Sequence, residues 1–464
     1  MRGGTARDPA AEPARWREVF EGRRGRLTAG LLLLETLVAM QILVVATVMP
    51  AARRDLGDLY LYGWTFSASG LGQFAAIPIS GRSMDRFGAR RLLVVALALY
   101  AGGLLLAAVA PSMLVLVLAR LLQGIGGGAI YAVSLGTVAK AYDERLRPRV
   151  LALLAAMWIL PGLIGPPLGA TLASTVGWRS AFVAPLPLLA ISAALTFSAL
   201  GRTPAEPDAE LPLLWPVVLA VGAAVALAGL TDVSALTVPL LALGLGIALP
   251  ALTRIVPAGT LTARPGLPAA AAAAFLLSAA FMSVDAFLPL MITDVRHRPY
   301  GEMGFVITAV TVAWSLGSWW QSRVAVRRSP TALTVLGDGL LILGLLVGAT
   351  ALVGWPLPIA YLGMTIGGVG MGIAFPTIPL SVMNAAAQGT EATELSATLL
   401  MDTLGIAIGA GLAGAIVAFA EARGATLAHG IGGAFALALV AALALLPVAR
   451  RLPRAQAAAV DSAA

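Results

Sequence analysis

Residues 112–138 read SMLVLVLARLLQGIGGGAIYAVSLGTV, a long apolar run whose one charged side chain is Arg120. A helix that crosses the hydrocarbon core of a bilayer needs about 20 mainly apolar residues, so this run predicts a membrane-spanning helix. The whole chain of 464 residues is similar, with 59% hydrophobic and 12% charged residues, against about 25% charged residues in soluble domains. A soluble fold of this composition would expose large apolar patches. The composition therefore excludes a soluble enzyme, a nucleic-acid binder and a fibrous protein.

Apolar runs of similar length recur along the sequence and predict an all-α polytopic membrane protein. Two sets of six are separated by residues 201–267, in which two further runs flank a turn containing Asp232. We therefore predict fourteen membrane-spanning helices: 27–50, 60–80, 92–110, 112–138, 149–175 and 180–200, then 213–231 and 234–253, then 268–292, 303–322, 331–354, 356–383, 395–420 and 429–448.

The predicted organisation has five parts. A tail over 1–26 precedes a six-helix bundle over 27–200, and the linker 201–267 contains the helix pair. A second six-helix bundle follows over 268–448, and a tail over 449–464 ends the chain.

The placement of basic residues gives the predicted topology. If both termini are cytoplasmic, 24 of the 31 basic residues fall at cytoplasmic ends, and six, including Arg53 and Arg54, fall outside. This excess follows the positive-inside rule. Residues 1–26 lack the apolar core of a signal peptide. We expect a multi-pass protein of the bacterial cytoplasmic membrane with both termini in the cytoplasm.

The two six-helix sets share small residues at matching positions. The fourth helix of the first set contains Gly124, Gly126, Gly127 and Gly128, and its counterpart contains Gly367, Gly368, Gly370 and Gly372. Repeats of this kind are typical of transporters that alternate access around a site between the repeats. Small residues for close helix packing are the alternative explanation.

The chain offers no basis for a metal or cofactor site. It has no cysteine, which excludes disulfides and thiolate ligands, and His297 and His429 are expected in loops. No Walker-type phosphate-binding motif is present in the sequence, and Lys140 follows Ala139 rather than a glycine loop. We expect no cofactor, no ATP, no nucleic acid and no catalytic residues; the partners are a small-molecule substrate, protons and the lipid bilayer.

The segment between the second and third predicted helices carries the first recognisable motif. Residues 81–93 read GRSMDRFGARRLL, which resembles the signature loop of the major facilitator superfamily, G-x-L-a-D-r-x-G-r-k-x-x-l. Gly81, Asp85, Arg86, Gly88 and Arg90 fall on its positions, whereas Ser83 and Ala89 depart from it. The resemblance implies the major facilitator fold and a gating role for these five residues, whose carboxylate and arginines can form charge-assisted contacts.

Two further motifs extend the resemblance over 27–200 and 268–448. In the fourth helix, Arg120, Gln123, Gly124, Gly127 and Tyr131 lie on one helical face, and the resemblance ties Arg120 to proton transfer. An arginine that snorkels to the interface is the alternative. In 161–170, PGLIGPPLGA, the residues Gly165, Pro166 and Gly169 match the superfamily's antiporter motif, while Pro161 and Ala170 replace its glycines. With the central helix pair, these motifs resemble the 14-helix drug:H+ antiporter branch.

Acidic residues inside predicted spans are candidates for proton coupling. A membrane carboxylate is costly and usually functional, and burial disfavours its charged form. Glu35 is our first candidate because a first-helix acid is a recurrent proton site in the resembling family, and Asp285 is the second. Asp338 and Asp402 lie closer to helix ends and are expected to be packing residues.

The remaining predicted site residues would line a central substrate cavity, for which core packing is the alternative: Gln41, Gln73, Gln123, Trp158, Phe281, Met282 and Phe375. Apolar walls with a few polar groups suit varied small ligands.

These observations lead to one functional hypothesis. The chain is expected to export amphipathic small molecules in exchange for protons by alternating access, without enzymatic activity, and as a monomer. A proton-coupled importer or facilitator of a small metabolite, or a lipid or glycolipid exporter, would share the fold. A membrane enzyme is disfavoured because the sequence offers no nucleophile–base pair.

Overall fold

The computed structural model describes residues 16–143, 145–200, 214–231, 234–386 and 391–453. Residues 1–15, 144, 201–213, 232–233, 387–390 and 454–464 lie outside this described part. The predictions for most of the two tails, for the first part of the linker and for Asp232 therefore lie outside it too. Its regular structure is helical, as the sequence predicted.

The first half of the molecule, α2 to α9, begins after the short helix α1. In chain order, these helices are α1 (Trp16–Val19), α2 (Gly22–Leu56), α3 (Tyr62–Phe87), α4 (Ala89–Ala108), α5 (Met113–Ala141), α6 (Arg147–Ala156), α7 (Ile159–Thr175), α8 (Ser180–Val183) and α9 (Leu186–Ala199), with the short turn η2 (Leu59–Leu61) before α3.

A hairpin of two helices, α10 (Trp215–Thr231) and α11 (Thr237–Ile255), precedes the second half, α12 to α18. The remaining helices are η3 (Thr260–Thr262), α12 (Leu267–Asp285), α13 (Leu288–Leu290), η4 (Met291–Val295), α14 (Tyr300–Val324), α15 (Pro330–Gly348), η5 (Ala349–Val353), α16 (Leu357–Ala385), α17 (Glu391–Ala422) and α18 (Leu427–Ala449).

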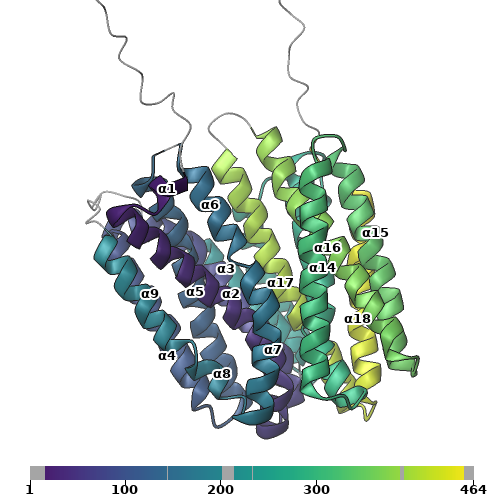
Figure 1. Ribbon diagram of the computed structural model, residues 1–464. Helices are drawn as coiled ribbons and strands as arrows, with labels where there is room; N and C mark the ends of the chain where they lie inside the picture. Colours follow the sequence, from purple (N-terminus) through teal and green to yellow (C-terminus); the bar gives the residue numbers. More distant parts are fainter. Residues whose placement is uncertain (1–15, 144, 201–213, 232–233, 387–390, 454–464) are drawn as a thin grey trace, which may run out of the picture.

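The two halves stand side by side with their long helices roughly parallel (Figure 1). The short helix α1 and the last turn of α18 lie at the same end of the bundle, which we call the termini face, and we call the opposite end the far face. Within the first half α5 packs on both α3 and α4, and within the second half α16 packs on both α14 and α15. The same packing pattern therefore occurs twice, as the glycine repeat predicted.

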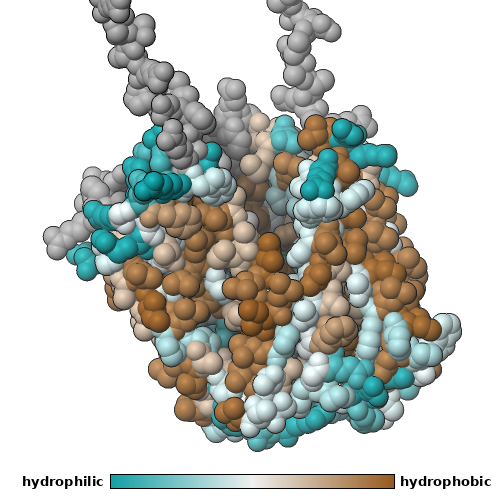
Figure 2. All heavy atoms as spheres, viewed as in Figure 1, coloured by the Kyte–Doolittle hydropathy of each residue, from teal (hydrophilic) through white to brown (hydrophobic). Residues whose placement is uncertain are grey.

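On the side seen in Figure 2, apolar residues form a belt across the middle of the molecule, and hydrophilic residues gather at its two ends. Twelve of the described helical segments are long and apolar enough to cross a membrane. Two elements of the predicted fourteen, α3 with its charged end and α10 with 17 residues, fall outside these twelve. The structure is compatible with fourteen spans, and that count, like the domain boundaries, stays a prediction.

Three predicted spans are interrupted rather than continuous. The segment 149–175 breaks between α6 and α7, 180–200 breaks between α8 and α9, and 268–292 breaks after α12. In each case a proline lies four residues after a residue in the break or at the end of the preceding helix: Pro161 follows Met157, Pro187 follows Val183 and Pro289 follows Asp285. Proline has no N–H to donate and its ring clashes with the carbonyl group four residues earlier. All three segments are nevertheless among those long and apolar enough to cross a membrane.

The segment 81–93, which was predicted to form the signature loop, is mostly helical. The helix α3 continues to Phe87 and α4 begins at Ala89, so the turn is made at Gly88. The backbone of Gly88 has a φ of 82°, in the region that favours glycine. The side chain of Asp85 lies outside the described part, whereas Arg86 lies 5.6 Å over the ring of Phe87 and Arg90 is exposed. The gating role of this motif remains a prediction.

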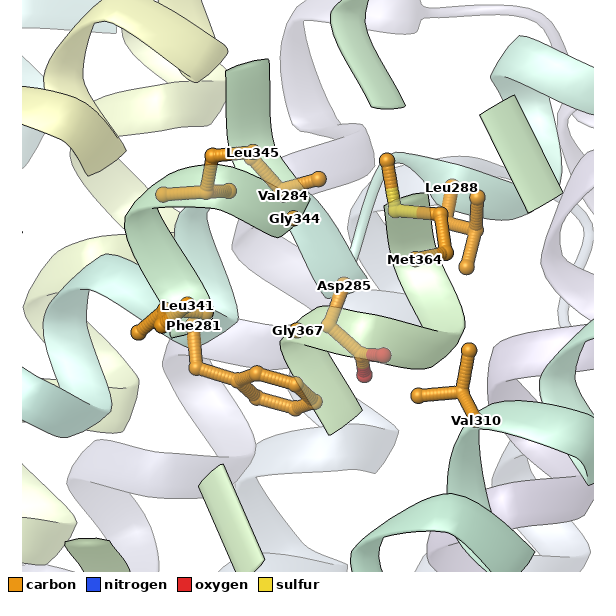
Figure 3. Close-up of a pocket in the computed structure, with 10 residues that line it drawn as sticks. All are labelled: Phe281, Val284, Asp285, Leu288, Val310, Leu341, Gly344, Leu345, Met364 and Gly367. Carbon is orange, nitrogen blue, oxygen red and sulfur yellow. The ribbon is translucent and has the colours of Figure 1, made fainter. Parts of the chain in front are cut away.

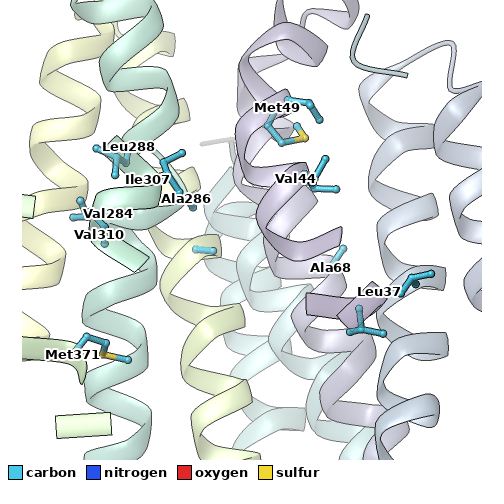
Figure 4. Close-up of a cluster of buried hydrophobic side chains, with 14 of the residues drawn as sticks. Leu37, Val44, Met49, Ala68, Val284, Ala286, Leu288, Ile307, Val310 and Met371 are labelled. Carbon is cyan, nitrogen blue, oxygen red and sulfur yellow. The ribbon is translucent and has the colours of Figure 1, made fainter. Parts of the chain in front are cut away.

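Buried hydrophobic side chains from both halves form the main core (Figure 4). A second, smaller cluster joins the hairpin to α3 and α17 and includes Phe74, Leu227 and Leu404. The hairpin thus packs on a helix of each half.

Glycines in α5 and α16 let helix backbones touch. A Cβ atom at Gly124 would collide with the carbonyl oxygen of Ser69 in α3, and one at Gly372 would collide with that of Trp314 in α14. Between helices in a membrane, such close approach is a main source of association energy.

The substitution Gly124→Ala should destabilise the protein by about 1–3 kcal/mol because the added methyl group overpacks the contact with α3. Gly102→Ala is the matched control, since a Cβ atom at Gly102 meets no atom within 4 Å. Thermal unfolding of the two variants in detergent measures the difference. Equal melting temperatures would contradict the packing described.

Candidate functional site

The two halves are separated by a recess at the termini face, visible between them in Figure 2. At the far face they are joined by a cluster of charged side chains that we call the far-face latch: Arg53 and Arg54 of α2 and Asp294 of η4. The molecule is therefore closed at one end and open at the other.

In the latch, two arginine side chains bind one carboxylate. Asp294 is 3.1 Å from Arg53 and 2.5 Å from Arg54, and its side chain is only 8% exposed. Arg54 also donates to the carbonyl oxygen of Thr293 at 3.2 Å. Charge-assisted bonds of this kind are stronger than neutral ones, and breaking one with a mostly buried partner leaves a costly unpaired charge. The latch thus stabilises the closed far face.

Helix contacts close the far-face half of both seams between the halves. On one seam, a Cβ atom at Gly63 of α3 would lie 2.6 Å from the Cα atom of Gly414 in α17. On the other, a Cβ atom at Gly304 of α14 would lie 3.0 Å from the carbonyl oxygen of Pro166 in α7. Access to the middle of the protein is consequently from the termini face.

Glu35, the first candidate for proton coupling, lies in α2 and is 7% exposed. Its Oε1 accepts a hydrogen bond from the indole Nε1 of Trp158 at 2.9 Å. Trp158 sits at the break between α6 and α7 and is 42% exposed. The proline-induced break thus places an indole donor on a carboxyl group inside the membrane-spanning region.

A second carboxyl group comes from the other half. Asp402 of α17 accepts a short hydrogen bond from the Ser278 hydroxyl of α12. Tyr131 of α5 lies within electrostatic reach of both Glu35 and Asp402. Asp402 was expected to be a packing residue, but in the structure it lies toward the same region as Glu35. Tyr131, Glu35 and Asp402 therefore mark the place where the halves face each other.

Arg120 is buried and bound within its own half. Its Nε donates to the carbonyl oxygen of Thr65 at 3.2 Å, and its guanidinium donates to the Gln123 side-chain oxygen at 2.6 Å. Gln123 in turn donates to the carbonyl oxygen of Gly103 at 3.1 Å. These contacts join α3, α4 and α5 around the arginine, which does not snorkel to the surface. Its connection to proton transfer remains a prediction.

Asp285, the second acidic candidate, lies apart from Glu35. Its carboxyl group borders a cavity of about 20 Å³ inside the second half, between α12, α14, α15 and α16 (Figure 3). The other lining residues are apolar, including Phe281, Val310 and Met364. A cavity of this size can hold one water molecule. Glu35 is not among the residues that line this cavity, and the part of Asp285 in proton coupling stays a prediction.

The predicted cavity residues of the second half form part of an aromatic cluster. Trp314 packs edge-on against Phe281 at 5.2 Å and against Phe375 at 5.4 Å between ring centroids. Phe281, Phe375 and Met282 are all half-buried. Gln73 of the first half is half-buried, whereas Gln41 is 1% exposed and its amide atoms have no hydrogen-bond partner in the described part. Whether these residues contact a substrate stays a prediction.

The residues of the antiporter motif place α7 between the halves. A Cβ atom at Gly165 would lie 3.2 Å from that of Leu43 in α2, and one at Gly169 would collide with Thr47. The carbonyl group of Pro166 faces α14. The motif thus lets α7 approach its own half closely while it contacts the other.

Sequence reasoning did not identify two of these features. Asp294 was not singled out, although Arg53 and Arg54 were placed at the same membrane face as its neighbour Arg296. Trp314 was not singled out either, and no sequence signal separates it from packing tryptophans. In the described part of the chain, no three His, Asp or Glu side chains gather as a metal site would require.

A two-half bundle of membrane-spanning helices, closed at one face and open at the other, is the architecture of a membrane transport protein. The family model of the Major Facilitator Superfamily matches residues 31–399. The chain belongs to the Major Facilitator Superfamily, and it is a multi-pass membrane transporter.

The relatives with curated names include a multidrug-efflux transporter and a multidrug resistance protein. A Mycobacterium tuberculosis protein named "Probable multidrug-efflux transporter" is 29% identical over 479 residues, which cover 96% of this chain and 100% of the relative. "Multidrug resistance protein 3" of Bacillus subtilis is 29% identical over 163 residues, or 35% of this chain and 32% of the relative.

Solved structures share the fold. A bacterial homologue of the lysosomal transporter Spinster, in an inward-facing and unoccupied conformation, superposes with a TM-score of 0.69 at 13% identity, covering 93% of this chain and 98% of that one. A D-xylose-proton symporter superposes with a TM-score of 0.66 at 14% identity, covering 93% and 100%. At these identities the likeness shows the fold alone.

The substitution Asp294→Asn should open the far face more often because it weakens the latch by about 1–2 kcal/mol, which corresponds to roughly a five- to thirty-fold change in population. The native chain has no cysteine, so Ala410→Cys, buried at 0% exposure in α17, can report the opening. We expect faster labelling of this cysteine by a membrane-impermeant maleimide from the far face.

Asp55→Asn is the control for this measurement, because Asp55 pairs with Arg179 within the first half. Unchanged labelling in Asp294→Asn, or an equal increase in Asp55→Asn, would refute the role of the latch.

Proposed function

We propose that this protein exports amphipathic small molecules from the cytoplasm in exchange for protons. The curated names of its relatives support efflux. The observation that carries the proton coupling is the Glu35 carboxyl group, which is buried in a membrane-spanning helix and bonded to the half-exposed Trp158. An ionisable group at this depth is costly unless it serves a function.

The proposal assigns the termini face to the cytoplasm, in agreement with the excess of basic residues on that side. In this orientation the structure is the inward-open state, with the far-face latch closed toward the exterior. Substrate enters from the cytoplasmic side and meets the aromatic cluster of Phe281, Trp314 and Phe375. Apolar and aromatic walls with a few polar groups suit varied amphipathic ligands.

Proton exchange follows from the contact between Glu35 and Trp158. The indole N–H donates a stronger hydrogen bond to a carboxylate than to a neutral carboxyl group, so loss of this contact in the other conformation would favour the protonated form of Glu35. In the outward-open state Glu35 takes up a proton from outside. Asp402 supplies a second carboxyl group opposite Glu35, and its nearness to Tyr131 suits the binding of a positively charged substrate.

The proton gradient is sufficient for this work. One elementary charge that crosses a potential of 100 mV releases roughly 2.3 kcal/mol, and one pH unit adds about 1.4 kcal/mol. Together these sustain a gradient of several hundredfold for a neutral substrate at one proton per cycle, since about 1.4 kcal/mol is tenfold. In this proposal the protein works as a monomer and without ATP.

The substitution Glu35→Gln should abolish substrate-dependent proton flux, because glutamine keeps the shape of the side chain but cannot exchange a proton. Purified protein in liposomes with an internal pH-sensitive dye measures the flux when a lipophilic cation is added under an imposed pH gradient. Asp285→Asn tests the second candidate, and its separate pocket predicts a partial effect.

Glu302→Gln is the matched control, since Glu302 is bonded to Arg298 at the far face and away from the recess. Proton flux that persists in Glu35→Gln would move the coupling to another residue. Substrate movement without any proton flux in the native protein would refute antiport.

A further inference from the structure

The interior of the second half contains a carboxyl group that the proposed function does not use. Asp338 is the ninth of the 19 residues of α15, and its side chain is 0% exposed. Neither of its carboxyl oxygens has a hydrogen-bond partner in the described part of the chain. The hydroxyl group of Thr334, one turn earlier on the same side of α15, is also buried without a partner there. Two polar groups are therefore buried on one side of this helix without compensation.

No basic side chain of the neighbouring helices neutralises a charge on Asp338. The main packing partners of α15 are α16, α18 and η5, and the described residues of these elements include no Asp, Glu, Lys or Arg. Their titratable groups, Tyr361 and His429, lie at the far-face ends, bonded to Glu302 and Thr426. An isolated charge in such an apolar interior costs far more than a neutral polar group.

A proton is the occupant that fits this carboxyl group. A metal ion would need about six oxygen ligands, and no three His, Asp or Glu side chains gather anywhere in the described residues. A proton needs no other ligand and removes the charge, which is how isolated carboxyl groups persist in apolar surroundings. A bound proton therefore accounts for Asp338 without any further partner.

The cavity beside Asp285 lies on the same side of α15 as Asp338. Leu341 and Leu345 line that cavity (Figure 3), and they follow Asp338 by three and seven residues, a spacing that keeps all three on one side of a helix. The axial rise from Asp338 to Leu341 is about 4.5 Å. Because α15 runs from the termini face to the far face, the cavity lies on the far-face side of Asp338.

The far-face end of α15 is tied to the latch. The helix η5 continues α15, and the carbonyl oxygen of its Ala351 accepts a hydrogen bond from Arg296 at 3.2 Å. The same guanidinium donates to the carbonyl oxygen of Trp355 at 3.1 Å. Arg296 follows Asp294 of the latch by two residues, so a movement of η4 when the latch opens acts directly on the end of α15.

We propose that Asp338 holds an occluded proton in this conformation and exchanges it, by way of the cavity at Asp285, when the far-face latch opens. The second half then carries a proton of its own in addition to the proton at Glu35. A second proton doubles the free energy that the gradient supplies in each cycle. This coupling to transport rests on the proposed efflux function, whereas the occluded proton itself does not.

Infrared spectroscopy of the native protein in liposomes tests for the occluded proton without any substrate. A protonated carboxyl group has a carbonyl stretching band that a carboxylate lacks, and deuterium oxide shifts this band when the proton exchanges. Incorporation of carboxyl-labelled aspartic acid separates aspartic acids from glutamic acids. We expect a protonated aspartic acid that exchanges slowly, because Asp338 is enclosed, and Asp338→Asn should remove this band. Asp285→Asn should remove only a faster one, since Asp285 borders a cavity with room for water.

The same measurement tests the connection to the latch. Asp294→Asn weakens the latch and should speed deuterium exchange at Asp338 by about fivefold or more. Asp55→Asn is the matched control, because it breaks an ion pair with Arg179 within the first half and should leave the exchange rate unchanged.

Transport measurements test whether the proton of Asp338 takes part in coupling. Liposomes with an internal pH-sensitive dye and radiolabelled tetraphenylphosphonium give the ratio of protons to exported cations. This ratio should fall by about half in Asp338→Asn, since one of the two proposed carriers is lost while Glu35 remains. Asp55→Asn should keep the native ratio.

The outcomes separate the occluded proton from efflux itself. Absence of a slowly exchanging aspartic acid in the native protein, or its persistence in folded Asp338→Asn, would overturn the occluded proton. Exchange that Asp294→Asn leaves unchanged would overturn the connection to the latch. An unchanged proton ratio in Asp338→Asn would show that this proton is not transported. Failure of the native protein to export the cation would count against efflux, and the infrared result would still decide on the occluded proton.

Discussion

The cost of a charged group inside a membrane governs the arrangement of this protein. Three of the ionisable side chains at this depth have hydrogen-bond partners that offset part of this cost. Arg120 binds a backbone carbonyl group and Gln123, Glu35 binds the indole of Trp158, and Asp402 binds Ser278. The strong ion pairs of the latch lie at the far face instead, where water can replace them when they separate.

This distribution suits a molecule that alternates between two conformations, each closed at one end. The contacts that hold the far face together are ionic and reversible, whereas the glycine contacts within each half are rigid. The hairpin adds an asymmetry, since it bridges α3 and α17 on one side only.

Much of the fold followed from the sequence, because hydrophobic length and small-residue spacing are local properties. The apolar run around Arg120 gave its helix, and the paired glycine runs gave the repeated packing. The breaks near Pro161 and Pro289 follow the rule for proline, whereas hydropathy alone does not separate a kinked span from a continuous one.

The site was less predictable, since it depends on which sides of the helices meet. Glu35 and Trp158 were both candidates, but nothing in their spacing of 123 positions indicated a hydrogen bond. Asp402 was expected to be a packing residue because it lies near a helix end, and its bond to Ser278 of another helix could not be predicted. Asp285, the second candidate after Glu35, borders a pocket inside the second half. These relations are set by tertiary packing.

The central claim is that protonation of Glu35 changes which face is open. It is tested most directly by spin-label distances across the halves, with Leu151→Cys and Val326→Cys at the termini face and Val109→Cys and Val353→Cys at the far face, all exposed positions. Acidification removes the carboxylate that Trp158 binds in this conformation and therefore favours the other one. The account predicts that the termini-face distance shortens while the far-face distance lengthens, and that Glu35→Gln no longer responds to pH. Distances that stay constant with pH, or that change equally in Glu35→Gln, would contradict it.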